Sequence, residues 1–183
     1  GLGHAEGIAG GLGAGGSTKT WTSSVGTWGA TGGVAAASAL SGGIAIATVD
    51  TSTANVMATI KLTRSAGVGG VIVRYADASN YVRAIHNGTN AQLIKRVAGV
   101  ETTLVDAAAT YSAGADLRII CDGSAFRLYY NNVFIGTQQT IADAGLASGT
   151  KQGVYSSDTG NTFDDFQVMA RGTGGEYAAL DNY

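Results

Sequence analysis

The sequence contains no proline and only one cysteine, and each shortage narrows the choice of fold. Without proline, tight turns have to rely on the 29 glycines and on Asn or Asp, the residues that tolerate positive φ. Cys121 cannot form an internal disulfide, and because it lies in an apolar run we expect a small core residue. A chain of 183 residues is long enough to bury a core without such cross-links.

Charged residues are scarce as well, at 13% of the chain against about 25% in an average globular domain. The 11 basic and 13 acidic residues form no block of either sign, which argues against a nucleic-acid partner. No apolar stretch approaches the roughly 20 residues that cross a bilayer, so we expect no membrane partner. The surface is rich in Ala, Ser, Thr and Gly, and we predict that neighbouring subunits of a homo-oligomer cover part of it.

The two ends of the chain differ in composition from its middle. Residues 1–18 are mostly Gly and Ala without helical or strand periodicity, which predicts an extended arm or linker. Residues 11–16 superficially match a dinucleotide-binding loop, but no hydrophobic strand precedes them and no helical pattern follows. Residues 172–183 form a polar tail, so we expect one folded domain over residues 19–171.

Within this domain, apolar and polar residues alternate with a period of two, the pattern of strands that bury one face. The clearest strand covers residues 56–63. Further strands are expected at residues 21–31, 71–75, 81–86, 91–97, 100–105, 117–122, 126–130, 133–135, 153–155 and 163–168. The only helical turn we expect lies near residues 141–146.

Turn residues connect these strands into hairpins. Asn87-Gly88 predicts a type I′ turn, and Asp122-Gly123 closes a second hairpin. Short strands at intervals of about ten residues, without a long helix, indicate an all-β fold: a two-sheet antiparallel jelly-roll sandwich. Alternation places Tyr75 on the same face as its neighbours at 71 and 73, with Arg74 on the opposite face.

Four stretches, read together and in order, carry a resemblance to a known family: residues 70–83, 92–104, 117–129 and 163–168. They resemble the concanavalin A-like lectin/glucanase superfamily, in particular the laminin-G-like modules of bacterial secreted proteins and tailed-phage virion proteins. The resemblance covers about residues 19 to 170. It implies two antiparallel sheets of five to seven strands, one concave and one convex, but no single function, because such modules bind glycans, build virions or act as spacers.

Catalysis on this fold would require two carboxylates on one strand face, about 5 to 5.5 Å apart in retaining glycosidases. The Glu-x-Asp-x-(x)-Glu strand of glucanases is absent, and the three glutamates, Glu6, Glu101 and Glu176, stand alone. His4 and His86 have no nucleophile motif nearby, and we expect both to be exposed to solvent. We therefore predict no catalytic residues and a protein that is not an enzyme.

Sugar binding is the stronger hypothesis, because aromatic faces stack on pyranose rings while Arg, Asn and Asp bind the hydroxyls. The candidate carbohydrate-binding residues are Tyr75, Tyr81, Arg83, Tyr129 and Tyr155. The alternative, which we favour for Tyr75 and Tyr81 because they lie at strand ends, is that the rings simply pack against the core. For Trp21 and Trp28 we favour that alternative and expect each to plug an end of the sandwich.

Asp164 and Asp165 precede the last predicted strand, in a segment that in related sandwiches sometimes helps to bind a structural calcium. Calcium prefers six to eight oxygen ligands, so this pair would need backbone carbonyls or Asp50 as well. No Asp-rich loop supplies them. We expect no cofactor, with a structural calcium ion as the one alternative.

Three functions stay open at this stage. The first is a non-catalytic structural or adhesion module of a virion or cell surface, of the phage tail, fibre or capsid-decoration type. The second is a carbohydrate-binding module of a secreted bacterial protein, and the third, least favoured, is a glucanase-like glycoside hydrolase. All three place the protein in a virion or outside the cell.

Overall fold

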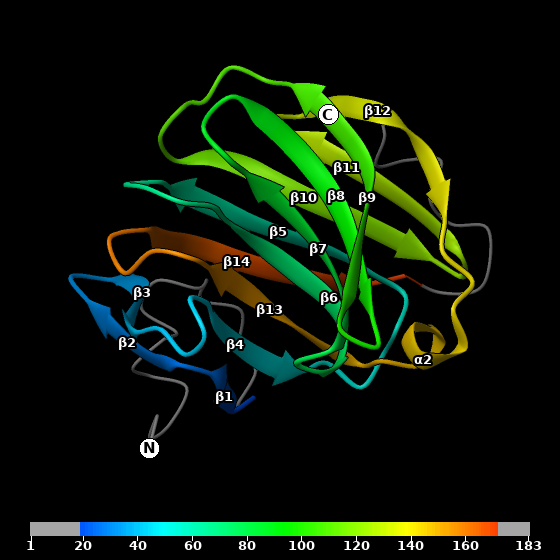
Figure 1. Ribbon diagram of the computed structural model, residues 1–183, viewed down its shortest axis with the longest axis horizontal. Coiled ribbons are helices and arrows are strands. Elements are labelled where there is room, and N and C mark those ends of the chain that lie inside the picture. The colour runs from blue at the N-terminus through cyan, green and yellow to red at the C-terminus, as the bar shows by residue number, and fades with distance from the viewer. Residues whose placement is uncertain (1–18, 172–183) are drawn as a thin grey trace.

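The computed structural model describes residues 19–171, so the predicted arm and tail lie outside the described residues. Two antiparallel sheets of seven strands each form a sandwich, which confirms the predicted fold class. In Figure 1 strands β8 and β9 of one sheet cross in front of β10 and β11 of the other. No helix in the described range has the length and apolarity needed to span a membrane.

The first sheet has the strand order β1-β4-β13-β6-β7-β8-β9. Its strands are β1 (Trp21–Val25), β4 (Ala45–Asp50), β13 (Lys151–Ser156), β6 (Gly69–Asp77), β7 (Asn80–His86), β8 (Asn90–Val97) and β9 (Val100–Ala108). Strands β6 to β9 form a continuous meander, because each pairs with the next along the chain.

The second sheet has the order β12-β11-β10-β5-β14-β3-β2. Its strands are β12 (Val133–Thr140), β11 (Ala125–Tyr130), β10 (Ala115–Asp122), β5 (Val56–Thr63), β14 (Thr162–Ala170), β3 (Val34–Ala39) and β2 (Thr27–Thr31). A four-residue helix, α2 (Ala144–Ala147), precedes β13. The chain crosses repeatedly between the sheets, so half of the twelve strand pairs join strands that are not consecutive in the sequence.

The main core lies between the sheets, where the apolar members of each alternating strand meet. Phe126, Phe163, Ile60 and Leu117 are among its fully buried side chains. Cys121 is buried there too, as predicted.

Trp21 and Trp28 are also buried in this core, which confirms their predicted packing role. Trp21 meets Phe166 edge-on with ring centroids 4.9 Å apart, and the ring of Trp28 lies 5.5 Å from that of Phe163.

The first 50 residues differ most from the sequence-based prediction. The single strand expected over residues 21–31 is two strands in different sheets, divided at Gly26, where φ is +65°. A side chain at Gly26 would overlap the backbone oxygen of Ala39, so glycine is required where the chain changes sheet. Strands β3 and β4 were not predicted, because β3 is mostly alanine and β4 is buried on both faces, so neither sequence alternates clearly.

The predicted hairpin at Asn87-Gly88 exists, but its turn is not type I′. Gly88 has φ +106° whereas Asn87 is not among the residues with positive φ. The side chain of Asn87 instead accepts hydrogen bonds from the backbone N–H groups of Thr89 and Asn90. Paired positive φ values, the mark of type I′, occur at Ala98-Gly99 and at Asn131-Asn132.

Candidate functional site on the outer face of the first sheet

The first sheet carries a second apolar cluster on the face that points away from the main core. Along β7, Val82 and Ala84 belong to the main core, so Tyr81, Arg83 and Ile85 project from the other face. We call this group the outer-face cluster. Its apolar members are Ile46, Ile72, Tyr75, Tyr81, Ile85, Ile94 and Tyr155.

Tyr75 reaches this cluster through a backbone irregularity. The register between β6 and β7 shifts after Val73, and Arg74 adopts φ +55°. This conformation reverses the alternation, so Tyr75 joins the outer-face cluster while Val73 stays in the main core. The expectation that the two share a face was therefore wrong.

Arg83 occupies the centre of the cluster, among the tyrosine rings. Its guanidinium carbon lies 4.4 Å from the ring centroid of Tyr155 and 5.8 Å from that of Tyr81, within cation–π range. Nη1 of Arg83 donates to the hydroxyl of Tyr81 at 3.1 Å. Tyr81 in turn stacks on Tyr75, with centroids 6.1 Å apart. Packing thus fixes the guanidinium before any ligand arrives.

Glu101 joins this centre to the β8–β9 hairpin. Its Oε2 accepts from Nη2 of Arg83 at 2.8 Å and its Oε1 from Nη1 of Arg96 at 3.0 Å. The side chain of Arg83 is 6% exposed, that of Arg96 29% and that of Glu101 37%. Nε of Arg83 and Nε of Arg96 are both buried without a hydrogen-bond acceptor in the described structure. Two strong donors are therefore unsatisfied beside one shared carboxylate.

The tyrosine hydroxyls in the cluster stay protonated at neutral pH. Burial raises the pKa of the Tyr155 and Tyr81 phenols above the usual value near 10.0, and the charge of Arg83 opposes this shift. Burial raises the pKa of Tyr75 in the same way. Each hydroxyl can therefore both donate and accept a hydrogen bond.

Four of the five residues predicted to bind sugar thus lie together, and Tyr129 does not. Tyr129 is on β11 in the second sheet, half-buried, with its ring 5.3 Å from that of Phe134. The other three tyrosines pack as the alternative interpretation expected, but in the outer-face cluster and not between the sheets. Their role in sugar binding stays a prediction.

Sequence reasoning missed Arg96 as a site residue and considered Glu101 only as an isolated carboxylate. A local signal could have revealed this contact. Arg96 on β8 is opposite Glu101 on β9, and the two-residue turn Ala98-Gly99 connects these strands. Opposite residues in an antiparallel pair have Cβ atoms about 4.5 to 5.5 Å apart, so an Arg–Glu contact follows from this register.

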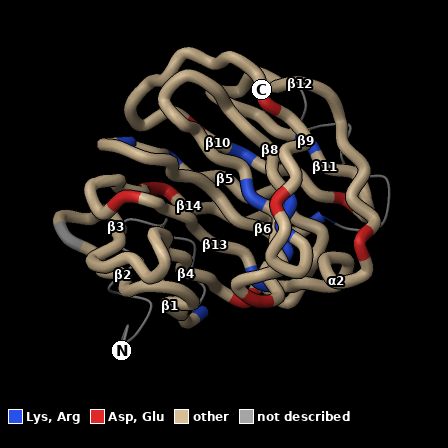
Figure 2. Tube along the Cα trace, viewed as in Figure 1, with Lys and Arg blue, Asp and Glu red and all other residues tan. Residues whose placement is uncertain are grey.

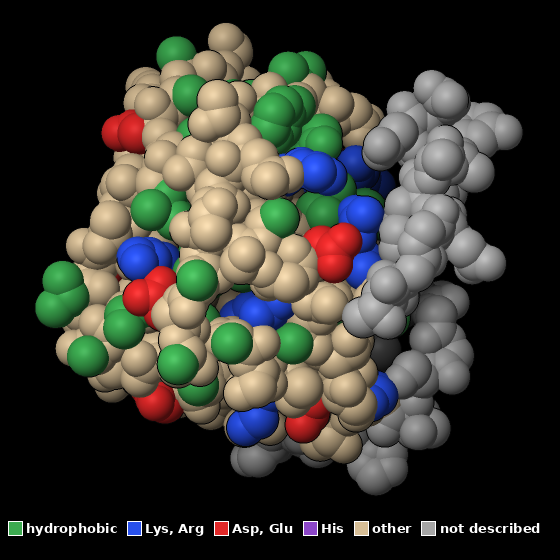
Figure 3. All heavy atoms as spheres, turned by 90° about the vertical axis from the view of Figure 1, so that its right-hand side faces the viewer, with side chains coloured by type: hydrophobic (Ala, Val, Ile, Leu, Met, Phe, Trp, Pro, Cys, Tyr) green, Lys and Arg blue, Asp and Glu red, His purple; other side chains and the backbone are tan. Residues whose placement is uncertain are grey.

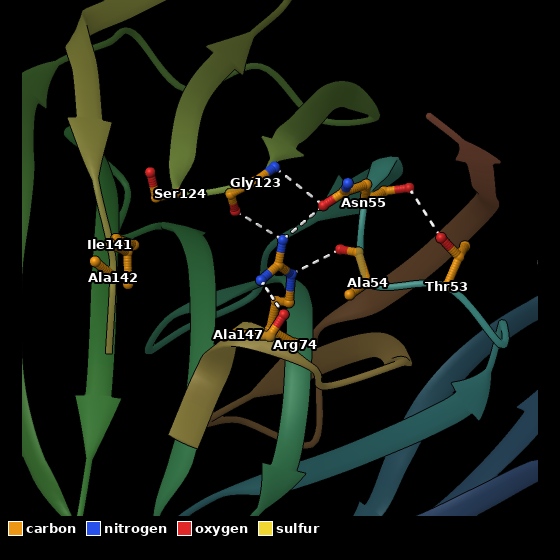
Figure 4. Close-up of a pocket in the computed structure, with 9 residues that line it drawn as sticks. All are labelled: Thr53, Ala54, Asn55, Arg74, Gly123, Ser124, Ile141, Ala142 and Ala147. Carbon is orange, nitrogen blue, oxygen red and sulfur yellow. Dashed lines mark hydrogen bonds between the residues drawn. The ribbon is translucent and has the colours of Figure 1, made fainter. Parts of the chain in front are cut away.

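A cavity of about 490 Å³ opens at the end of the sandwich beside Arg74 (Figure 4). Its walls come from the segment before β5, from β6, from the β10–β11 turn, and from α2 with the segment before it. They include Thr53, Ala54, Asn55, Gly123, Ser124, Ile141, Ala142 and Ala147. The cavity is large enough for a small ligand. Whether it can bind one through its charged lining residue depends on whether Arg74 has free hydrogen-bond donors.

Arg74 makes all its contacts with the protein itself. It donates to the backbone oxygens of Ala54, Leu146, Ala147 and Gly123 and to Oδ1 of Asn55, at 2.7 to 3.3 Å. Every nitrogen of its guanidinium is used, so the buried charge ties three loops together. This arrangement indicates a structural role and leaves no free donor facing the cavity.

His86 is fully buried, so the expectation of an exposed histidine was wrong. Its ring lies 4.6 Å from that of Tyr130 and 5.4 Å from that of Tyr111. Nδ1 accepts from the backbone N–H of Gly88, which leaves Nε2 to donate to the backbone oxygen of Ala109. Burial lowers its pKa below 6.5, and His86 is therefore a neutral packing residue. His4 lies outside the described residues.

The aspartates considered for calcium are engaged with the protein. Asp165 pairs with Lys61, and Asp164 accepts from the backbone N–H of Asp165. Asp50, on β4 of the other sheet, accepts from the backbone N–H of Ser52. Within residues 19–171 no three His, Cys, Asp or Glu side chains gather as metal ligands would. The calcium hypothesis stays a prediction without a full ligand set.

Charged side chains of both signs are scattered over the described surface. Figure 2 shows basic and acidic residues interspersed along the strands. The face in Figure 3 carries scattered hydrophobic side chains and a group of them at the upper right, with basic and acidic groups close together. The distinctive chemistry is therefore local, and it lies in the outer-face cluster.

Comparison with solved structures identifies the fold. The sandwich is similar to the carbohydrate-binding module CBM66 from Bacillus subtilis, with a TM-score of 0.69 and 16% identity over 82% of this chain and 95% of that one. It is also similar to a GH43 protein from Bacillus licheniformis, with a TM-score of 0.56 and 15% identity over 79% of this chain and 35% of that one. A Saccharomyces cerevisiae protein of unknown function matches with a TM-score of 0.54 and 12% identity over 84% of this chain and 96% of that one.

No protein-family model and no curated protein sequence matches the chain. The structural matches share the concanavalin A-like lectin/glucanase fold, which the sequence predicted for this chain. At these identities the likeness establishes the fold alone. The laminin-G-like and phage detail of the resemblance stays a prediction.

Proposed function

We propose that this chain, a sandwich of the concanavalin A-like fold, is a non-catalytic glycan-binding module whose ligand binds to the outer face of the first sheet. The observation that carries the proposal is the Arg83–Glu101–Arg96 network, with its two unsatisfied Nε donors among tyrosine hydroxyls. The similarity to a carbohydrate-binding module supports it.

The chemistry of the network suits a polyhydroxylated ligand. Sugar hydroxyls donate and accept, and here guanidinium donors, carboxylate acceptors and phenol hydroxyls lie within one cluster. The faces of Tyr81 and Tyr155 are partly occupied by Arg83 itself, so we assign recognition to hydrogen bonds and not to stacking on those two rings. Arg96 and Glu101, the more exposed members, form the edge from which a sugar enters.

A non-catalytic role fits the carboxylates of the face. Glu101 is the glutamate of this network, and both of its oxygens are held by arginines. A glycosidase needs one carboxylate as acid and a second as nucleophile or base. Hydrolysis of β-glucans by the intact chain that disappears in Glu101→Gln would instead show an enzyme.

A glycan array followed by isothermal titration calorimetry tests the proposal on the full chain. Arg96→Ala should weaken binding by about tenfold or more, because it removes a charged donor at the edge of the site. Arg127→Ala is the matched control, since Arg127 lies on the second sheet and bonds to Gln138. An array without hits, together with a melting temperature that no sugar raises, would refute glycan binding.

A structural or adhesive role in a virion or cell-surface assembly is the second proposal. It is supported by the low charge content and by exposed Val133 and Phe134 on β12, at the edge of the second sheet. Both roles place the protein outside the cell or in a virion. Size-exclusion chromatography with light scattering would count against the assembly role if the intact chain stays monomeric at high concentration.

A further inference from the structure

We infer that the outer-face site selects acidic glycans and binds a uronate carboxylate through Arg96 and Arg83. This inference rests on the proposed function, and it adds the chemical class of the ligand. It starts from the charges on the face and from the geometry of the two guanidinium groups.

The charges of the network do not balance. Arg83 and Arg96 contribute two positive charges and Glu101 one negative charge, and Arg83 is almost fully buried. A further acidic group, Asp77, lies near Tyr75 and offsets part of this charge, since the groups that donate to it, the N–H of Ser79 and the side chain of Asn80, are neutral. Buried charges in proteins are normally paired, so the surplus positive charge favours an anionic ligand.

The free edge of Arg96 has the shape of a carboxylate site. Among the described residues Arg96 forms a hydrogen bond only through Nη1, to Glu101. The Nε–H and one N–H of Nη2 point the same way on a guanidinium and bind the two oxygens of a carboxylate side by side. Nε of Arg96 is buried, so a ligand carboxylate has to displace the atoms that cover it to form both bonds. Glu101 occupies the other end of the group, so a second carboxylate binds without displacing it.

Arg83 supports the same ligand from inside the cluster. Nη1 and Nη2 of Arg83 are used by Tyr81 and Glu101, while its Nε has no acceptor in the described structure. Its side chain is 6% exposed and is held over the rings of Tyr155 and Tyr81, so it cannot turn away to solvent. An anion at this point satisfies a donor that the protein alone leaves unpaired.

Uronic acids carry such a carboxylate directly on the pyranose ring, in place of the hydroxymethyl group of a neutral hexose. A neutral sugar offers hydroxyls to the same donors but leaves the positive charge unbalanced. Both classes form charge-assisted hydrogen bonds with the guanidinium groups, but only a carboxylate adds the attraction of opposite charges and a bidentate pair of bonds, so the site should discriminate between the two classes.

The test uses calorimetry on the full chain with three uronate-containing probes, polygalacturonate oligosaccharides, alginate oligosaccharides and hyaluronan oligosaccharides, beside neutral dextran and β-glucan oligosaccharides. For whichever acid binds, its methyl ester is the matched ligand, because it keeps the sugar backbone and removes the charge. We expect the ester to bind about tenfold more weakly or worse. Added salt should weaken binding of the acid more than binding of the ester.

Arg96→Lys tests the bidentate geometry, since lysine keeps the charge but not the planar pair of donors. We expect weaker binding of the acid with an unchanged melting temperature, and no loss in the control Arg127→Lys. Equal affinity for acid and ester, an unaltered Arg96→Lys, or binding of neutral glycans alone would overturn acidic selectivity and leave glycan binding intact. Failure of all the acidic and neutral glycans would overturn both.

Discussion

The guanidinium carbon of Arg83 lies 4.4 Å from the ring centroid of Tyr155, although the two residues are 72 positions apart in the sequence. Strand β7, which carries Arg83, and β13, which carries Tyr155, are not neighbours, because β6 lies between them. The contact therefore reaches across a whole strand of the first sheet. It helps to fix the position of the guanidinium on the outer face.

Replacing Arg83 should cost stability as well as ligand binding. Arg83→Met keeps much of the side-chain volume but removes the cation–π contact and the bonds to Tyr81 and Glu101. We expect a loss of about 1 to 2 kcal/mol in the free energy of unfolding. Urea denaturation measures it, with Arg127→Met as the surface control. An unchanged midpoint would show that the cluster does not hold Arg83 in solution as it does in the structure.

The Arg74 contacts predict a larger loss of stability than those of Arg83. Arg74→Lys retains the charge but supplies only three donors from one nitrogen, so several of the five oxygens around it lose their partner. We expect a loss of about 2 to 4 kcal/mol in the free energy of unfolding. The measurement is again urea denaturation, and a loss below that of Arg127→Lys would contradict the structural role.

His86 predicts how stability changes with pH. Burial lowers its pKa in the folded protein below the ordinary 6.5, so the unfolded chain binds this proton more readily. The contribution of neutral His86 is therefore complete above about pH 6.5 and decreases as the pH falls from there towards the folded pKa. Melting temperatures between pH 7.5 and 5.5 should fall in the wild type and less steeply in His86→Phe. Parallel curves would show that His86 does not carry the dependence.

Gly70 marks a close approach of two strands in the first sheet. A Cβ at Gly70 would overlap the carbonyl oxygen of Ala84 on β7. Because this oxygen belongs to the paired backbone, it cannot move away as a flexible side chain could. We expect Gly70→Ala to destabilise the fold by about 3 kcal/mol or more, or to prevent folding. Gly29→Ala is the control, because no atom lies within 4 Å of the added carbon. Similar melting temperatures for the two variants would contradict this tight approach.

Most of the strands could be predicted from the sequence because their cause is local. Alternation at residues 56–63 and at residues 117–122 marks one buried face, and β5 and β10 follow it. Strands β3 and β4 were missed for the same reason: the small side chains of alanine-rich β3 alternate too weakly to reveal a face, and β4 is buried on both faces. Turn residues located the hairpins but not always the turn type, which depends on the register of the paired strands.

Only part of the candidate site could be predicted from the sequence. The sequence determined a sandwich of short strands, a core without disulfides, and a set of tyrosines and arginines that could bind sugar. Only the tertiary structure decided which of them meet: the positive φ of Arg74 turned Tyr75 to the outer face, and sheet pairing left Tyr129 on the other sheet. It also brought Glu101 between two arginines. Alternation depends only on residues that are neighbours in the sequence. These contacts depend on strand order and register, which are determined by the packing of the whole chain.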